Sequence, residues 1–145
     1  MKIPIQLLVA VSLLVACVPS KARIGETLDE VLKRYGRCLK TGTSSDGEMF
    51  KVFGKGGFKI YVQFYQNKVD EMGYVKESPM SDEEMKALMQ DNAPGEWTGI
   101  GWPGYIWSNS GMSARYFPER NQLVIVTGAA FEREKKKYKG DLDGL

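Results

Sequence analysis

Two stretches of the same design set the fold: Thr27-Leu28-Asp29-Glu30-Val31 and, 54 residues further along the chain, Ser81-Asp82-Glu83-Glu84-Met85. Each has a hydroxyl residue followed three positions later by a glutamate. In this capping box the hydroxyl accepts from the third helical amide, and the glutamate reaches back to the cap amide. Apolar residues then recur at helical spacing, so both stretches predict the start of an amphipathic helix.

The spacing of 54 residues also relates Phe53 to Trp107, Gly57 to Gly111 and Asn67 to Asn121. Alternating apolar and polar residues, separated by turns rich in glycine or asparagine, predict strands in each unit. The expected strands cover residues 48–54, 58–66 and 69–76, and then 104–109, 113–118 and 122–128. We therefore expect an α+β fold of two tandem helix-strand-strand-strand repeats, forming one antiparallel sheet with its helices on one face.

Residues 1–22 have the pattern of an export signal: an early cation, Lys2, then an apolar run and a short polar stretch that ends at Ala22. Cleavage there makes Arg23 the first residue. The alternative is lipidation of Cys17, because Leu14-Val15-Ala16-Cys17 resembles a bacterial lipobox. The expected organisation is a signal peptide at 1–22, repeats at 23–78 and 79–128, and a charged, partly helical tail at 129–145.

The composition excludes several classes of function. The chain of 145 residues has no histidine, which excludes Ser-His-Asp and Cys-His catalysis and most zinc or haem ligation. Without the two lysines of residues 1–22 it has 18 basic and 18 acidic residues, which argues against a nucleic-acid partner. The carboxylates neither converge in pairs nor follow calcium-loop spacing, so we expect no catalytic residue, metal or cofactor.

The aromatic residues predict a binding surface. If Ile60 and Phe64 face the helices, Tyr61 and Tyr65 face away, and we expect Phe53 and Trp107 to face away with them. Rigid rings and arginine dominate binding hot spots because they bury much area for little lost entropy. The candidate binding residues are Phe53, Tyr61, Tyr65, Trp97, Trp102, Tyr105, Trp107, Arg115 and Phe117. A second small core beneath the loop at 95–104 is the alternative.

The start of the first unit, Ile24-Gly25-Glu26-Thr27-Leu28-Asp29-Glu30-Val31-Leu32-Lys33-Arg34-Tyr35-Gly36, resembles that of small envelope domains of the SmpA/OmlA outer-membrane lipoprotein type. The doubling of a helix-plus-hairpin unit resembles the tandem-repeat fold of secreted β-lactamase inhibitor proteins. The chain departs from the first pattern in the position of its glycine, and in Arg37-Cys38 where that family commonly has a proline. The resemblance implies an exported interaction domain and assigns no role to a particular residue.

The leading hypothesis is a noncatalytic binding module, periplasmic or secreted, that recognises a protein or an envelope polymer through an aromatic sheet face. One alternative is a lipid-anchored structural or assembly-accessory subunit of the bacterial envelope, held at the outer membrane by Cys17. Only in that case is a membrane an expected partner. A small carboxylate hydrolase is a further alternative. Large rings left in water promote association, so a homodimer through the same face also remains open.

Overall fold

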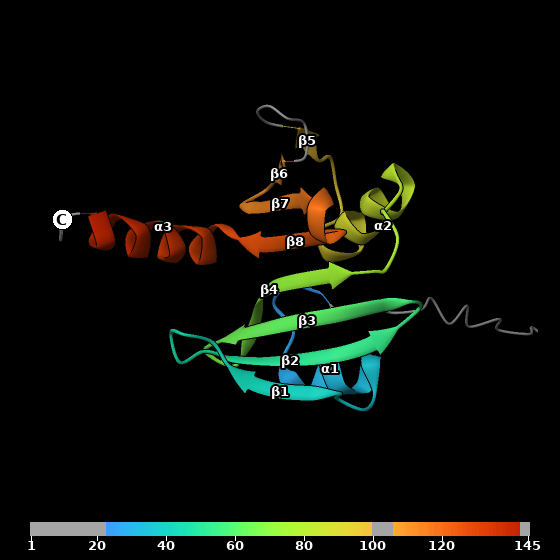
Figure 1. Cartoon of the computed structure of the whole chain (residues 1–145), viewed down its shortest axis with the longest axis horizontal. Coiled ribbons are helices and arrows are strands. Elements are labelled where there is room, and N and C mark those ends of the chain that lie inside the picture. The colour runs from blue at the N-terminus through green and yellow to red at the C-terminus, as the bar shows by residue number, and fades with distance from the viewer. Residues whose placement is uncertain (1–22, 100–105, 143–145) are drawn as a thin grey trace, which may run out of the picture.

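The computed structural model describes residues 23–99 and 106–142, with side chains described as far as Lys136. This part of the chain is an α+β fold with three α-helices and one antiparallel sheet of eight strands (Figure 1). The helices are α1 (Leu28–Tyr35), α2 (Asp82–Asn92) and α3 (Gly128–Leu142). The strands are β1 (Lys40–Thr43), β2 (Met49–Lys55), β3 (Phe58–Tyr65), β4 (Lys68–Val75), β5 (Thr98–Gly99), β6 (Ile106–Asn109), β7 (Met112–Phe117) and β8 (Gln122–Thr127), and a short 3-10 helix, η1 (Pro118–Arg120), precedes β8.

The strands follow the order β1-β2-β3-β4-β8-β7-β6-β5, so β4 and β8 meet at the centre of the sheet. The sequence predicts the six inner strands, but not the two edge strands β1 and β5. The reason is that β1 is largely polar and exposed, and β5 has only two residues. In β1, the ring of Phe50 packs over Gly42 and occupies the space that a side chain at this position would enter.

One face of the sheet carries the core. Phe53, Ile60, Tyr74, Leu123 and Tyr116 stand opposite one another across five strands and are all buried. Helices α1 and α2 pack on this face: their buried residues form one cluster with the five sheet residues just named. These helix residues are Val31, Met85, Leu88 and Met89. We call this side the helix face, and the opposite side the open face.

Polar contacts tie the α2 region to the sheet. The backbone amide of Met80 donates to the Tyr116 hydroxyl at 3.1 Å, just before the helix begins. At the other end, the side-chain amide of Asn92 donates to the Tyr74 hydroxyl at 2.9 Å. The hydroxyls of the two buried tyrosines are thereby satisfied, which a buried polar group requires.

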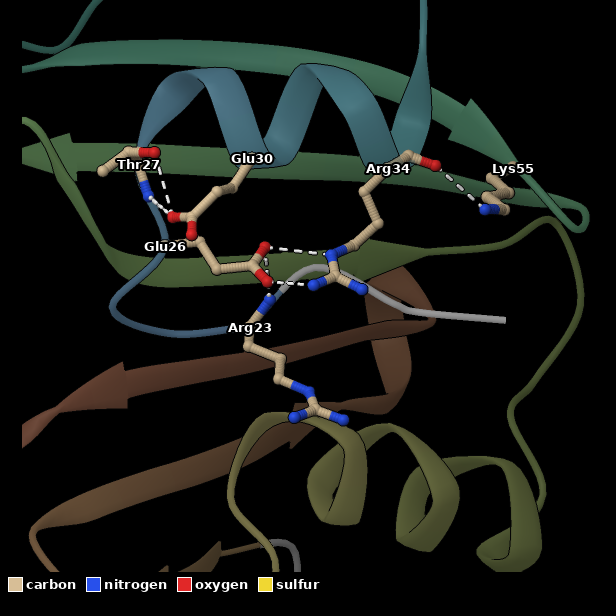
Figure 2. Close-up of polar contacts among 6 residues, drawn as sticks. All are labelled: Arg23, Glu26, Thr27, Glu30, Arg34 and Lys55. Atoms are coloured by element: carbon tan, nitrogen blue, oxygen red, sulfur yellow. Dashed lines mark hydrogen bonds and ion pairs between the residues drawn. The ribbon is translucent and has the colours of Figure 1, made fainter. Parts of the chain in front are cut away.

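The two predicted helix starts differ in detail. At α2 the Ser81 hydroxyl accepts from the Glu84 amide at 3.1 Å, and the Ser81 amide donates to the Glu84 carboxylate at 2.9 Å. At α1 the Thr27 amide donates to the Glu30 carboxylate at 2.7 Å, and the Thr27 hydroxyl also donates to that carboxylate, at 2.9 Å (Figure 2). The hydroxyl of Thr27 is therefore engaged with a carboxylate, whereas that of Ser81 satisfies a helix amide.

Helix α3 begins directly after β8. The Thr127 hydroxyl accepts from the Ala130 amide at 3.0 Å, which satisfies one of the first amides of the helix. Figure 1 shows α3 running on from the end of β8, away from the sheet. The first turns of α3 contribute to the surface of the sheet.

Candidate binding face

The open face of the sheet carries four of the nine predicted binding residues. Pairing places Tyr61 opposite Gly73, Gly73 opposite Val124, and Val124 opposite Arg115, so all lie on one face. Tyr65 and Phe117 follow two residues after Gln63 and Arg115 on β3 and β7, and so share that face. Tyr61 is 40% exposed and Tyr65 is 37% exposed. The prediction that these four residues face away from α1 and α2 is correct.

The prediction that Phe53 lies on the open face is wrong, because its ring is fully buried on the helix face. It is opposite Ile60 and lies 5.4 Å from the ring of Tyr35 in α1. The sequence of β2 does not show which of its sides faces the helices, because Phe50 and Val52 make the other side equally apolar. Lys55, two residues after Phe53, lies on the same side of β2 and makes that side look solvent-exposed in the sequence. Its ammonium instead donates to the Arg34 carbonyl of α1 at 3.0 Å (Figure 2).

Two tryptophans also lie with the core. Trp107 is opposite Ala114 and packs against the core cluster, so its expected position on the open face is wrong. Trp97 is half-buried against the same cluster, and its indole donates to the Ala93 carbonyl at 3.0 Å. Both rings pack against the main core cluster, whereas the alternative expected a second small core beneath the loop at 95–104, part of which lies outside the described residues. Trp102 and Tyr105 lie outside the described residues.

A groove of about 440 Å³ lies on the open face beside α3. Ile106, Val124 and Val126 supply apolar lining from the sheet, and Phe131, which is 43% exposed, supplies a ring from α3. Arg115 and Glu134 contribute the charged groups of the groove. The sequence predicts Arg115 and Phe117 as binding residues but none of the other residues that line the groove, because the groove depends on where α3 leaves the sheet.

Two cations contact the ring of Phe117, which lines the groove. The guanidinium carbon of Arg115 is 4.7 Å from the centre of the Phe117 ring, and that of Arg120 is 4.4 Å from it. A ring in such contacts is held in place. The Arg120 guanidinium also lies 3.4 Å from a carboxylate oxygen of Glu119, whereas Arg115 has no ion-pair partner among the described residues. This end of the groove is therefore aromatic and positively charged.

Arg133 fixes the first turns of α3 to the open face. Its guanidinium lies 3.7 Å from the centre of the Tyr65 ring, pairs with the Asp70 carboxylate, and lies 3.7 Å from a carboxylate oxygen of Glu48. Gln63 in turn donates to Glu48. We call these five residues the Arg133 cluster.

A β-bulge brings Asp70 to the Arg133 cluster. Gln63 pairs with Glu71 and Phe64 with Val69, so Asp70 is the extra residue on β4. Its side chain is 9% exposed. Burial raises the pKa of Asp70, and the hydrogen bond and charge of Arg133 oppose that rise. Because Arg133 holds this carboxylate, the cluster serves to position α3.

The described residues show no group of histidine, cysteine, aspartate and glutamate that would hold a metal ion. Cys38 is half-buried with a free thiol, which donates to the Lys40 carbonyl at 3.0 Å. In the same part of the chain, no helix is long and apolar enough to cross a membrane. What the open face offers is contact surface: rings, apolar side chains and a few charges.

No family model matches the chain, and no curated protein matches it. Among solved structures, it is similar to a cysteine-rich secretory protein from Staphylococcus aureus, with 8% sequence identity and a TM-score of 0.49. The similarity covers 74% of this chain and 44% of that one. A likeness at this level carries no argument about function.

Proposed function

We propose that the chain is an exported, noncatalytic binding domain that contacts a protein partner through the open face of its sheet. The observation that carries this proposal is that Tyr61, Tyr65, Phe117 and Arg115 all lie on the face opposite α1 and α2, which also holds an apolar groove. A protein partner suits this face better than a polymer of sugars, because the groove is lined mainly by apolar side chains, and Ile106, Val124 and Val126 among them are aliphatic.

The energetics of the open face support binding. Tyr61 and Tyr65 leave more than a third of their surface in water, and Phe131 does the same at the groove. Covering such rings gains apolar burial at a low entropic cost. Arg133 stacks on Tyr65 and the two arginines stack on Phe117, so two of the rings are oriented before a partner arrives.

The contacts of Arg23 support cleavage after Ala22. The Arg23 backbone nitrogen donates to the Glu26 carboxylate at 3.2 Å, and Arg34 holds the same carboxylate (Figure 2). After cleavage that nitrogen becomes a charged terminal amine, and Glu26 is placed to pair with it. Among the described residues, backbone pairing of this segment with β4 begins at Gly25, which cleavage after Ala22 leaves in place. The intact mass of the exported protein distinguishes an Arg23 start from a lipidated Cys17 start.

A capture experiment with matched variants tests the binding proposal. The wild-type protein, a Tyr61→Ala/Tyr65→Ala variant and a Lys86→Ala control on the exposed side of α2 serve as baits in an extract of the cell envelope. We expect a protein captured by wild type and control to be lost with the double variant, while all three baits melt at similar temperatures. Equal capture by the double variant would contradict the proposal.

We also propose that the two halves of the chain are copies of one unit of a helix and four strands. In support, α1 and α2 begin 54 residues apart, as do β3 and β7, and β4 and β8. The strand order is also symmetric about the pair of β4 and β8. The test is superposition of residues 27–74 on 81–128 in an experimental structure. A helix of one half that overlays a strand of the other would refute it.

A further inference from the structure

We infer that a second copy of the chain occupies the groove on the open face, forming a twofold dimer. This inference rests on the proposed role of the open face as a contact surface and names a partner for one part of it. The part is the groove, which β6, β7, β8 and α3 line. The exposed rings of Tyr61 and Tyr65 lie on β3, on the other side of the central pair β4 and β8, and remain for a different partner.

The charges of the groove are arranged along its length. On β7, Ser113 is opposite Val126, close to where β8 passes into α3, and Arg115 and Phe117 follow in the direction away from α3. Glu134 lies on α3 itself. The groove therefore has an acidic end at α3 and a basic end at Phe117. Among the described residues, neither Arg115 nor Glu134 has an ion-pair partner.

A surface of this kind is complementary to itself. In a twofold interface the same patch of both copies meets in opposite directions, so a contact between two different residues occurs twice. The basic end of one groove then faces the acidic end of the other, and Arg115 meets Glu134 of the second copy. A groove whose charged residues all had the same sign, or a groove without charges, would not specify this orientation of the two copies.

The apolar residues fit the same arrangement. Phe131 is 43% exposed in the single chain and stands beside Val124 and Val126 in the lining of the groove. Covering the groove with a second copy removes both Phe131 rings from water together with the aliphatic lining beneath them. Because Arg133 ties the first turns of α3 to Asp70, Phe131 and Glu134 are held in position before the copies meet.

Charge reversal in the purified protein tests the dimer by sedimentation velocity at several protein concentrations. We expect wild type to dimerise, and Arg115→Glu and Glu134→Arg each to raise the dissociation constant by about tenfold or more, because each variant places like charges together twice. The double variant Arg115→Glu/Glu134→Arg restores both pairs and should dimerise as wild type does. Lys86→Glu, on the far side of the sheet, is the matched control and should change nothing.

Two results would overturn the inference: a wild-type protein that stays monomeric at every concentration, or a double variant as weak as the single ones. Restoration by the double variant also excludes misfolding as the cause of the single defects. This experiment contains no other protein, so its failure leaves the capture experiment on Tyr61 and Tyr65 intact. A monomer that still captures an envelope protein through those rings would retain the proposed function without the dimer.

Discussion

The two faces of the sheet use aromatic residues in opposite ways. On the helix face, Phe53 and Tyr74 are no more than 1% exposed, and α1 and α2 cover the sheet around them. On the open face, Tyr61 stands on the strand next to Phe53 and keeps 40% of its surface in water. The difference teaches that residue type alone does not identify a binding ring. Neighbouring residues of a strand point to opposite faces, so the position of an aromatic residue along the strand determines whether its ring stabilises the core or is exposed for binding.

Paired truncations give the largest expected contrast between the faces. Phe53→Ala should lower the free energy of unfolding by about 3–5 kcal/mol, because it removes a buried ring and leaves a cavity under α1. Tyr61→Ala should change it by about 0.5 kcal/mol or less, as substitutions at the surface usually do. Urea unfolding of both variants measures the two values. Similar losses for both would show that Tyr61 belongs to the core.

Arg133→Gln tests how α3 is joined to the open face, with a smaller expected effect. Above the pKa of Asp70 in the folded protein, the variant leaves an ionised, buried carboxylate without its partner. We expect a loss of about 1–2 kcal/mol near neutral pH.

The pH dependence of this loss has a definite sign. Burial raises the pKa of Asp70, and without Arg133 it rises further. Protonation therefore favours the folded variant, and its deficit against wild type should shrink as the pH falls through that raised value. Unfolding of both proteins across the pH range measures the deficit. Lys135→Gln is the control, because its pair with Glu132 is more than half exposed. A deficit that grows on acidification would contradict the role given to Asp70.

The helix starts on the helix face give the smallest contrast. Ser81→Ala removes an acceptor from the Glu84 amide and should cost about 1 kcal/mol. Thr27→Ala should cost less, because the Thr27 hydroxyl donates to the Glu30 carboxylate and its capping contact with the Glu30 amide is too weak to count as a hydrogen bond. Thermal melts of the two variants rank them. A larger loss at Thr27 would show that the two capping boxes are not used as the contacts indicate.

The sequence predicts what depends on neighbouring residues. Both capping boxes, the inner strands and the turn at Asn67 follow from local chemistry, and Asn67 and Asn121 do adopt positive φ. The phase of β2 was not predictable, because Phe50, Val52 and Phe53 make both sides of that strand apolar. The Arg133 cluster was not predictable either, since its pair joins residues 63 positions apart and needs a bulge at Asp70.

Site-specific photo-crosslinking tests the central claim, contact through the open face, most directly. A benzophenone amino acid replaces Tyr61 in one variant, and Lys86 on the exposed side of α2 in another, and each is irradiated in cells that produce the protein. The account predicts a crosslinked protein adduct from position 61 and none from position 86. Adducts from position 86 alone would contradict it and would place the contact surface on the helix side.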